Sequence, residues 1–551
     1  MQTQKTAPPS RRPVALRVGI VLLALLGVVA GFSPDTVVPD AAANPSKGHA
    51  QHSHRAPVVE VDGGLLRGTV TGDVQEFRGV PYAAPPLGSL RWRPPQRVRP
   101  WRGIRDASAF GPVCPQAPPS PNGSSEDCLA LNVTAPTRAP HGRRALPVLV
   151  WIHGGGYAIG EGADYDATQL AAEGTVVVTI NYRLGPLGFL AHPALARHRG
   201  GASGNYGLMD QQAALRWVQR NIGRFGGDPR NVTIAGQSAG GLSVLNQLVS
   251  PGARGLFQRA VVQSGAFAPK QESLRQGEAD GRTFAEAAGC PEQTAECLRA
   301  LPASTLVANE PLSYTPGIVD GAVIRESVGS AIAAGRFHRV PLVNGSNHEE
   351  ERIFTNLGLS VSNGATVALP GPITVDSYED VISTTLGVSA PKAAAAAAEY
   401  PVESYGSAAL AFSALSSDAN FSCPALVLDR AAAKYVPTYG YEFNDDTAPE
   451  RFVPDALGPP YVATHQTELQ YLFGLPNAAP ATLTPSQEAL ARTMRSAWAQ
   501  FAATGSPSTR QGTWPRFDDR RERILSLTST GPVVDGTFAE RHHCAFWKAF
   551  G

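Results

Sequence analysis

The sequence predicts an α/β fold built on a large, mostly parallel β-sheet with helices on both faces. Two fully apolar runs, residues 147–152 and 176–180, have the composition of strands at the centre of a parallel sheet. Residues 210–225 carry apolar side chains at helical spacing. A third short apolar run, residues 231–235, leads into a predicted helix at 241–248. Strands that alternate with helices in this way favour parallel pairing through crossover connections.

The other elements follow this pattern along the chain. Residues 58–82 form short alternating runs around a Gly-Gly turn, which predicts a small N-terminal antiparallel sheet. The stretches 265–339 and 352–436 are mainly helical, and we expect them to be insertions above the sheet that form the walls of a pocket. Later strands and an amphipathic helix are predicted at 260–263, 341–344, 439–443 and 487–503.

Length and composition limit the domain organisation and the partners. The chain has 551 residues and 43% hydrophobic content, enough for a large core. No internal repeat or long low-complexity stretch divides it, so we expect residues 57–551 to form one α/β domain. The 47 basic and 46 acidic residues leave a formal net charge of +1, which argues against nucleic acid as a partner.

The N-terminus has the pattern of an export signal. Residues 18–32 form a continuous apolar run, and small residues at 41–43 supply a cleavage site. Four basic residues precede the run without any acid: Lys5, Arg11, Arg12 and Arg17. The run is shorter than the about 20 residues of a membrane span. We therefore expect residues 1–43 to be a signal peptide, residues 44–56 a disordered linker, and the protein to be secreted or extracytoplasmic without a stable membrane span. A retained anchor is the alternative.

All six cysteines lie after this segment, which suggests disulfide bonds. Local spacing suggests that Cys114 pairs with Cys128 and Cys290 with Cys297, which leaves Cys423 and Cys544. Cysteine arithmetic alone does not choose among the possible pairings. The sequence has no Cys-x-x-Cys pair, which argues against a zinc site, and we expect neither a metal nor a cofactor.

A serine lies between glycines where the third apolar run meets its helix, in Gly236-Gln237-Ser238-Ala239-Gly240. This is the pattern of a nucleophile elbow, in which a strained turn projects the serine hydroxyl above the sheet. A side chain at either flanking glycine would clash with a neighbouring element. The hydroxyl would lie at a helix N-terminus, where the helix dipole favours a developing anion. The pentapeptide alone is a weak signal in a chain with 56 glycines, and the flanking strand and helix strengthen it.

A second glycine-rich motif, His153-Gly154-Gly155-Gly156, directly follows the apolar run that ends at Ile152. Glycines let successive backbone N–H groups approach one point closely, so the motif predicts an oxyanion hole. A glycine-rich loop without a ligand is the alternative. An acyl-transfer site also needs a base and an acid that orients it.

Taken together, these motifs resemble those of type-B carboxylesterases, the cholinesterase-like family of α/β-hydrolases. The resemblance covers residues 57–550. It is carried by residues 77–83 (FRGVPYA), 125–129 (SEDCL), 181–183 (NYR), 236–241 (GQSAGG), 263–265 (QSG) and 471–474 (YLFG). It implies the α/β-hydrolase fold, a carboxylesterase activity on a small-molecule ester, and no cofactor. It also implies the three cysteine pairs suggested above, and structural ion pairs of Arg91 with Glu126 and of Arg183 with Asp210.

The resemblance further implies roles for single residues. Ser238 matches the family's nucleophile and His465 its base, while Glu350 matches the acid that orients the base. The family's oxyanion donors match the N–H groups of Gly155, Gly156 and Ala239. Because Glu349, Glu350 and Glu351 are consecutive, the acid can be misassigned by one residue. Aromatic candidates for the pocket are Tyr157, Phe267 and Phe354, which can equally belong to the core.

Two departures from the family pattern bear on the substrate. No Trp lies between Cys114 and Cys128, and Gln237 stands where the family often has Glu. The first removes a cation–π platform and the second a nearby negative charge, so a general carboxylesterase is favoured over a choline-ester specialist. A lipase, thioesterase or amidase is the alternative. A non-catalytic adhesion-type relative is disfavoured because the chain keeps every catalytic residue.

Overall fold

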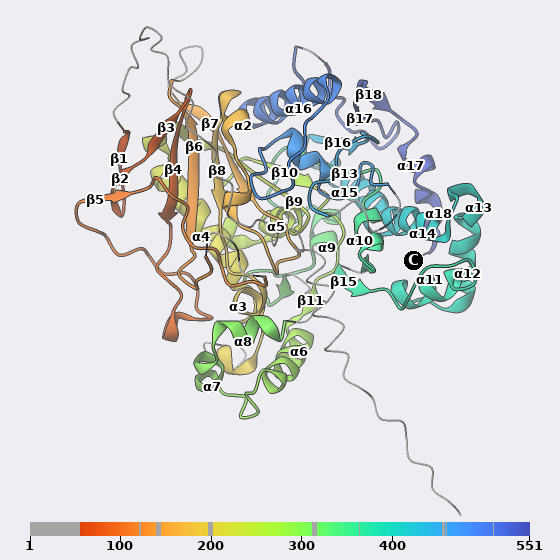
Figure 1. Cartoon of the computed structure of the whole chain (residues 1–551), viewed down its shortest axis with the longest axis horizontal. Coiled ribbons are helices and arrows are strands. Elements are labelled where there is room, and N and C mark those ends of the chain that lie inside the picture. Colours follow the sequence, from red (N-terminus) through yellow and green to blue (C-terminus); the bar gives the residue numbers. More distant parts are fainter. Residues whose placement is uncertain are drawn as a thin grey trace, which may run out of the picture.

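An 11-stranded sheet forms the centre of the computed structural model (Figure 1). The structure describes residues 56–550 except 119, 121–122, 139–144, 197–201, 311–316, 363, 454–457, 459 and 511. The predicted signal peptide and nearly all of the predicted linker therefore lie outside the described residues. Among the helices of the described part, none has both the length and the apolar character needed to cross a membrane.

The large sheet is parallel in its centre and antiparallel at both edges. Its strands are β3 (Thr69–Thr71), β4 (Val74–Pro81), β6 (Ala130–Pro136), β7 (Leu146–Ile152), β8 (Val176–Ile180), β9 (Gly227–Gln237), β10 (Arg259–Gln263), β13 (Leu342–Asn347), β16 (Thr438–Phe443), β17 (Ile524–Thr528) and β18 (Gly531–Asp535). In space the order is β18-β17-β16-β13-β10-β9-β7-β8-β6-β4-β3. Strands from β17 to β8 in this order pair in parallel, whereas β18, β6, β4 and β3 pair antiparallel. The predicted fold class is thus confirmed.

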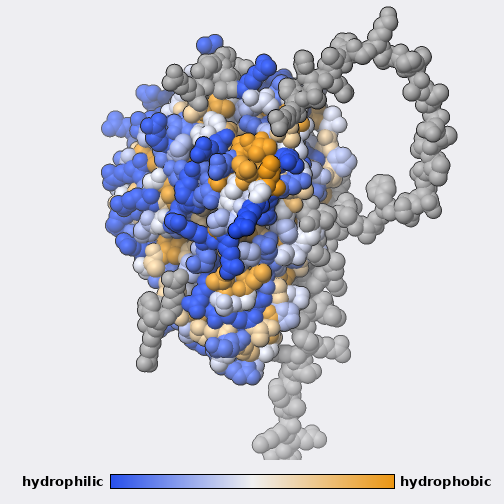
Figure 2. Space-filling view, turned by 90° about the vertical axis from the view of Figure 1, so that its left-hand side faces the viewer, coloured by the Kyte–Doolittle hydropathy of each residue, from blue (hydrophilic) through white to orange (hydrophobic). Residues whose placement is uncertain are grey.

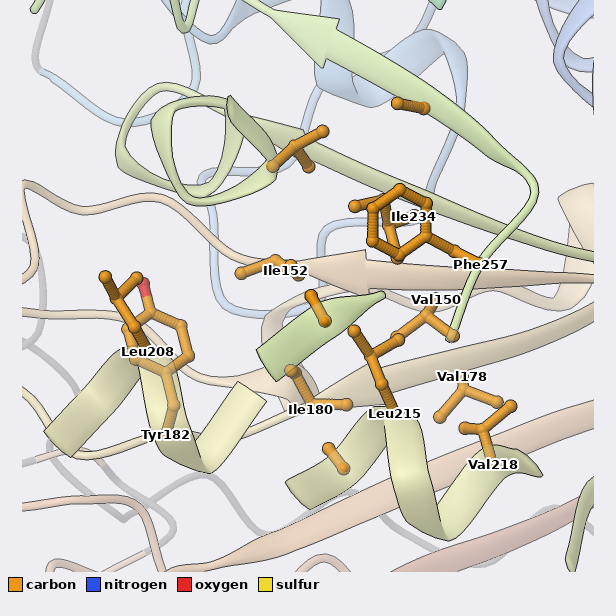
Figure 3. Close-up of a cluster of buried hydrophobic side chains, with 14 of the residues drawn as sticks. Val150, Ile152, Val178, Ile180, Tyr182, Leu208, Leu215, Val218, Ile234 and Phe257 are labelled. Carbon is orange, nitrogen blue, oxygen red and sulfur yellow. The ribbon is translucent and has the colours of Figure 1, made fainter. Parts of the chain in front are cut away.

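Alternate side chains of the central strands enter two separate cores. Along β7, Val150 and Ile152 face one side and pack near α4 (Tyr206–Asn221) and α5 (Ala239–Val249), as Figure 3 shows for Leu215 and Val218 of α4. Trp151 faces the other side, where α2 (Thr168–Ala172) and α16 (Pro485–Thr504) cover the sheet. This alternation follows from the two-residue period of a strand. Burying each large apolar side chain stabilises the fold by about 1.5–3 kcal/mol.

Helical insertions surround one end of the sheet, as the sequence predicts. The further helices are α3 (Gly185–Phe189), α6 (Leu274–Ala287), α7 (Ala295–Ala300), α8 (Ala303–Ala308), α9 (Val328–Ala333), α10 (Arg352–Asn356), α11 (Tyr378–Leu386), α12 (Ala390–Glu399), α13 (Val402–Tyr405), α14 (Ala408–Ser417), α15 (Cys423–Ala432), α17 (Phe538–Arg541) and α18 (Cys544–Phe550). In Figure 1, α6 to α8 form a group at the bottom, and α11 to α14 form a group at the right with α18. Two short strand pairs interrupt the helices: β11 (Glu272–Ser273) with β12 (Ile318–Val319), and β14 (Leu359–Ser362) with β15 (Ala365–Ala368).

The N-terminal sheet differs in part from the prediction. β1 (Val58–Val61) and β2 (Gly64–Arg67) form the expected antiparallel hairpin, but β5 (Ile104–Asp106) adds to β2 in parallel. β3 and β4 belong to the large sheet instead, because Phe77 and Val80 of β4 are buried in the main core. Figure 2 shows the face on this side of the molecule as mainly hydrophilic, with a few separate hydrophobic patches.

The structure contains the disulfides and the two ion pairs that the sequence suggests. The disulfides join Cys114 to Cys128, Cys290 to Cys297 and Cys423 to Cys544, which are the pairs suggested by the sequence. The ion pair of Arg183 with Asp210 is buried, with Nε 2.7 Å from Oδ2. The ion pair of Arg91 with Glu126 has Nη2 2.5 Å from Oε1.

Candidate active site

The elbow lies at the centre of the sheet, where β9 ends at Gln237 and α5 begins at Ala239. Ser238 between them has φ 57° and ψ −124°, a conformation that a non-glycine residue rarely adopts. A side chain at Gly240 would collide with the carbonyl oxygen of Ile152, and a Cβ at Gly236 would lie 2.5 Å from the carbonyl of Gly240. The two glycines therefore allow β7, β9 and α5 to meet closely, which leaves Ser238 half-buried at the helix N-terminus.

The glycine-rich loop after β7 folds directly against the elbow. A Cβ at Gly154 would lie 3.1 Å from Cβ of Ser238. Gly155 has φ 94° and Gly156 has φ 61°, left-handed values that favour glycine. Within the described part of the chain, the N–H groups of Gly155, Gly156 and Ala239 donate to no protein acceptor. They therefore remain available to a ligand oxygen.

His153 fixes the start of this loop. Its carbonyl oxygen accepts a hydrogen bond of 2.8 Å from the hydroxyl of Tyr182, and the two rings are stacked with centroids 4.4 Å apart. Its Nδ1 lies 2.9 Å from the carbonyl oxygen of Gly154. Burial lowers the pKa of His153 to about 4, so the ring is neutral at ordinary pH.

The structure brings Glu350 and His465 together at the same edge of the sheet. Nδ1 of His465 lies 2.5 Å from Oε2 of Glu350, and both side chains are buried. Glu350 follows β13, and His465 lies in the loop after β16. The two residues meet because the carboxyl ends of parallel strands share one edge of the sheet. Backbone contacts join the two segments, since the N–H of Glu349 donates to the carbonyl of Ala463 at 2.9 Å.

The three consecutive acids have different partners. Glu349 forms an ion pair with Arg352, with Oε2 and Nη2 3.0 Å apart. Oε1 of Glu351 accepts the N–H of Val361 at 2.9 Å, and burial raises the pKa of this carboxyl group to about 8. Of the three, Glu350 is the one in contact with His465, at the position that the resemblance implies.

The other imidazole nitrogen of His465 lies at the elbow but faces Gln237. Its Nε2 is 3.1 Å from Nε2 of Gln237, which precedes Ser238. Among the described residues, the Ser238 hydroxyl forms no hydrogen bond with His465. From the sequence, Gln237 is notable only as a departure from the family pattern. Its contact with His465, 228 positions away, leaves no signal in the local sequence.

A buried polar network supports the Glu350 turn from behind. The N–H of Asn347 donates to Oε1 of Glu350, and its Nδ2 donates to the carbonyl of Thr464 and to Oε2 of Glu468, all at 2.7 Å. Nε2 of Gln263 donates to Oε1 of Glu468 at 3.1 Å. Burial raises the pKa of Glu468 to about 7. Sequence reasoning did not identify this network, although Asn347 and Glu468 lie three residues from Glu350 and His465.

Aromatic side chains border the imidazole. The rings of Phe354 and Phe421 have centroids 5.1 and 5.3 Å from that of His465. Phe267 contacts Phe421 with centroids 5.6 Å apart. Tyr157, the third aromatic candidate, is buried in the core beneath the glycine-rich loop. Phe421 was not predicted, because nothing in its local sequence indicates its position.

Two groups of side chains in the described residues have metal-ligating atoms close together. In the first group, Cys290 and Cys297 form a disulfide. In the second, Oε1 of Glu442 lies 2.7 Å from both His348 Nδ1 and His542 Nε2. Arg541 lies 2.5 Å from the other oxygen of Glu442. These contacts have the geometry of a paired ion network.

Comparisons with known proteins identify the family of this chain. The model of the carboxylesterase family matches residues 55–547. Fumonisin B1 esterase of Sphingopyxis macrogoltabida is 37% identical over 86% of each chain. Para-nitrobenzyl esterase of Bacillus subtilis is 34% identical over 89% of this chain and 98% of its own. A solved structure of PNB esterase covers 89% of this chain and 100% of its own, with a TM-score of 0.74 and 32% identity. These similarities identify the protein as a carboxylic ester hydrolase, and the chain belongs to the carboxylesterase family.

Proposed function

We propose that this protein is a secreted serine carboxylesterase that works through an acyl-enzyme intermediate, with Ser238 as nucleophile, His465 as base and Glu350 as the acid that orients the base. The main support is the buried 2.5 Å contact of Glu350 with His465 beside the strained elbow of Ser238. The contact lies at a sheet edge where the N–H groups of Gly155 and Gly156 have no acceptor among the residues that the structure describes.

The proposed reaction has two similar halves. Nε2 of His465 takes the proton of the Ser238 hydroxyl while Oγ bonds to the ester carbonyl carbon. The carbonyl oxygen becomes an oxyanion held by the N–H groups of Gly155, Gly156 and Ala239, each worth about 2.7–4 kcal/mol in such sites. The ester C–O bond breaks, and the alcohol leaves with the proton from Nε2. Water then attacks the acyl group in the same way, and the carboxylic acid and free Ser238 are released.

Glu350 stays ionised during this cycle. It accepts the Nδ1–H of His465 and so fixes the tautomer in which Nε2 carries the lone pair. The N–H of Asn347 keeps the carboxylate in this orientation. No cofactor is required, because every proton moves between groups of the chain, the substrate and water.

Secretion is supported by the basic, then apolar, then small-residue pattern of the N-terminus. N-terminal sequencing of the exported protein tests this proposal. We expect a mature chain that begins after residues 41–43. An intact N-terminus on the exported protein would contradict cleavage.

Replacing the nucleophile is the direct test of the mechanism. We expect Ser238→Ala to lower kcat by about 10⁶-fold, as in other enzymes that lose this group. The thermal unfolding midpoint should change little, because Ser238 is half-buried and its side chain makes no capping hydrogen bond. A serine-directed organophosphate should label Ser238 in the parent and nothing in the variant. Ester hydrolysis at the parental rate by Ser238→Ala would assign the nucleophile to another residue.

The substrate class is tested with a panel of p-nitrophenyl esters of increasing acyl length, together with thioesters and amides. A general carboxylesterase should hydrolyse the p-nitrophenyl esters faster than the amides, because p-nitrophenoxide is a better leaving group than an amine, and it should hydrolyse the thioesters no faster than the esters. A neutral Gln237 gives no charge that would favour cationic alcohols. Faster turnover of a thioester or an amide would favour those alternatives on the same fold.

A further inference from the structure

Gln237 directly contacts the proposed base. Its side-chain Nε2 lies 3.1 Å from Nε2 of His465, and Gln237 is only 1% exposed. The NH₂ group of an amide is a donor and has no lone pair to accept a hydrogen bond. Nε2 of His465 is therefore the acceptor in this contact. The ring proton accordingly lies on Nδ1, which faces Oε2 of Glu350 at 2.5 Å.

The surroundings of Gln237 hold its amide in this place. Its backbone lies opposite Gln263 in the parallel pairing of β9 with β10, and the next N–H, that of Ser238, donates to the carbonyl of Gln263 at 2.8 Å. On the other side, a Cβ at Gly154 would lie 3.1 Å from Oε1 of Gln237 and 2.8 Å from its carbonyl oxygen. The amide is thus confined between the glycine-rich loop and the imidazole.

We infer that Gln237 is a positioning residue, which donates a hydrogen bond to Nε2 of His465 in the resting enzyme. This hydrogen bond keeps Nε2 unprotonated and directed at the elbow. During catalysis the hydroxyl of Ser238 replaces the amide of Gln237 as the donor to Nε2. The inference rests on the proposed function, in which Nε2 accepts the proton of Ser238. It explains why the imidazole faces Glu350 with Nδ1 and the elbow with Nε2 although, among the described residues, no hydrogen bond joins it to Ser238.

The charge of residue 237 should then set the pH at which the base becomes active. If Nε2 were protonated, its hydrogen would find no lone pair on the NH₂ group of Gln237. A carboxylate at the same position would accept that hydrogen and stabilise imidazolium by its negative charge. An opposite charge within hydrogen-bond distance typically shifts a pKa by about 1–3 units. The family's common Glu and this chain's Gln should therefore give different pH profiles.

The test compares Gln237→Glu, which has the same shape and adds a charge, with Gln237→Met, which has similar length and no donor. For each variant, kcat/KM for p-nitrophenyl butyrate and the rate of organophosphate inactivation are measured across the pH range. We expect the midpoint of both profiles to rise by about one unit or more in Gln237→Glu. In Gln237→Met it should rise less, with a several-fold lower plateau because the imidazole loses a positioning contact.

The matched control is Gln247→Met. Gln247 is also buried, and its amide donates to two acceptors, the carbonyl of Leu208 and the side chain of Gln211. In the described part of the chain it forms no hydrogen bond with the imidazole. This variant should lose stability without a change in the pH midpoint. Equal midpoints in the parent, Gln237→Glu and Gln237→Met, with Ser238 labelled in all three, would overturn the role of Gln237 and leave the proposed function standing. Failure of the organophosphate to label Ser238 in the parent would overturn the proposed function itself.

Discussion

At the scale of single residues, the Glu350 turn places two neighbouring carboxyl groups in different environments. Glu350 has a positively polarised partner in His465, whereas Glu351 is fully buried and accepts one backbone N–H. Its second oxygen has no hydrogen-bond partner among the described residues. Burial without a cation favours the neutral acid, which raises the pKa of Glu351 from about 4.5 to about 8. The neighbouring charge of Glu350 acts in the same direction.

This shift predicts a loss of stability as pH rises. The unfolded chain releases the Glu351 proton near pH 4.5, whereas the folded chain holds it to about pH 8. Between these values the folded state binds more protons, so rising pH favours unfolding. We expect Glu351→Gln to remove this contribution. The unfolding midpoint of this variant should therefore rise relative to that of the parent as the pH increases from 5 to 8. The exposed Glu379→Gln serves as control. If the unfolding midpoints of Glu351→Gln and the parent changed with pH in parallel, Glu351 would be ionised in the folded protein.

The site residues differ in how far the sequence could identify them. Ser238 and the glycines around it form a contiguous motif, and their local geometry follows from the strand-to-helix turn. Glu350 and His465 required the family resemblance, because an acid or a histidine in a loop carries little information by itself. The contact of Gln237 with His465 joins positions 228 residues apart and depends on how the whole sheet is assembled. No local pattern predicts such a contact.

At the scale of elements, burial decides which strands could be predicted. β7 and β8 are buried along their whole length, and the sequence shows this as unbroken apolar runs. The edge hairpin of β17 and β18 was missed. Val533 and Val534 of β18 are exposed, and β17 joins the large sheet by pairing with β16. β6 was also missed, since it pairs antiparallel on both sides and its sequence mixes polar with apolar residues.

The end of β13 carries a connection between two loops that we expect to matter for both stability and rate. Asn347→Ala would leave the carbonyl of Thr464 and Oε2 of Glu468 without their Nδ2 donor. The carbonyl of Thr464 still accepts from the hydroxyl of Thr467 at 2.8 Å, whereas Oε2 of Glu468 would be left unsatisfied in the interior, which costs about 1–3 kcal/mol. We expect a lower unfolding midpoint in denaturant and a fall in kcat, because the loop of His465 is no longer tied to the Glu350 turn.

Asn344 on the same strand offers a matched control for this prediction. It is equally buried, and its Nδ2 also donates twice, to the carbonyl of Ala425 and to Asp429. These partners lie on α15, so Asn344→Ala should lower stability by a similar amount and leave kcat close to the parental value. A similar loss of kcat in both variants would mean that general destabilisation, and not the connection made by Asn347, lowers the rate.

At the scale of the whole molecule, the C-terminal segment is joined to the helical insertion beside the site. Cys544 at the start of α18 forms a disulfide with Cys423 at the start of α15. Two residues before Cys423, the ring of Phe421 contacts the imidazole of His465. Hydrogen bonds of His542 to Asp418 and Glu442 add to the same attachment. The last helix of the chain therefore helps to hold the wall of the candidate site.

The lengths of the closed loops predict how much each disulfide stabilises the fold. The pair Cys423–Cys544 closes 121 residues, and the pair Cys290–Cys297 closes 7. Because a cross-link restricts the unfolded chain more when its loop is longer, the two should contribute about 5 and about 2 kcal/mol. Replacing Cys423 and Cys544 together by Ser should therefore lower the unfolding midpoint more than replacing Cys290 and Cys297 together by Ser. Loss of the Cys423–Cys544 disulfide should also lower esterase activity at temperatures where the rest of the fold persists. An equal or smaller effect of the long link would show that the C-terminal segment is held mainly by its hydrogen bonds and packing.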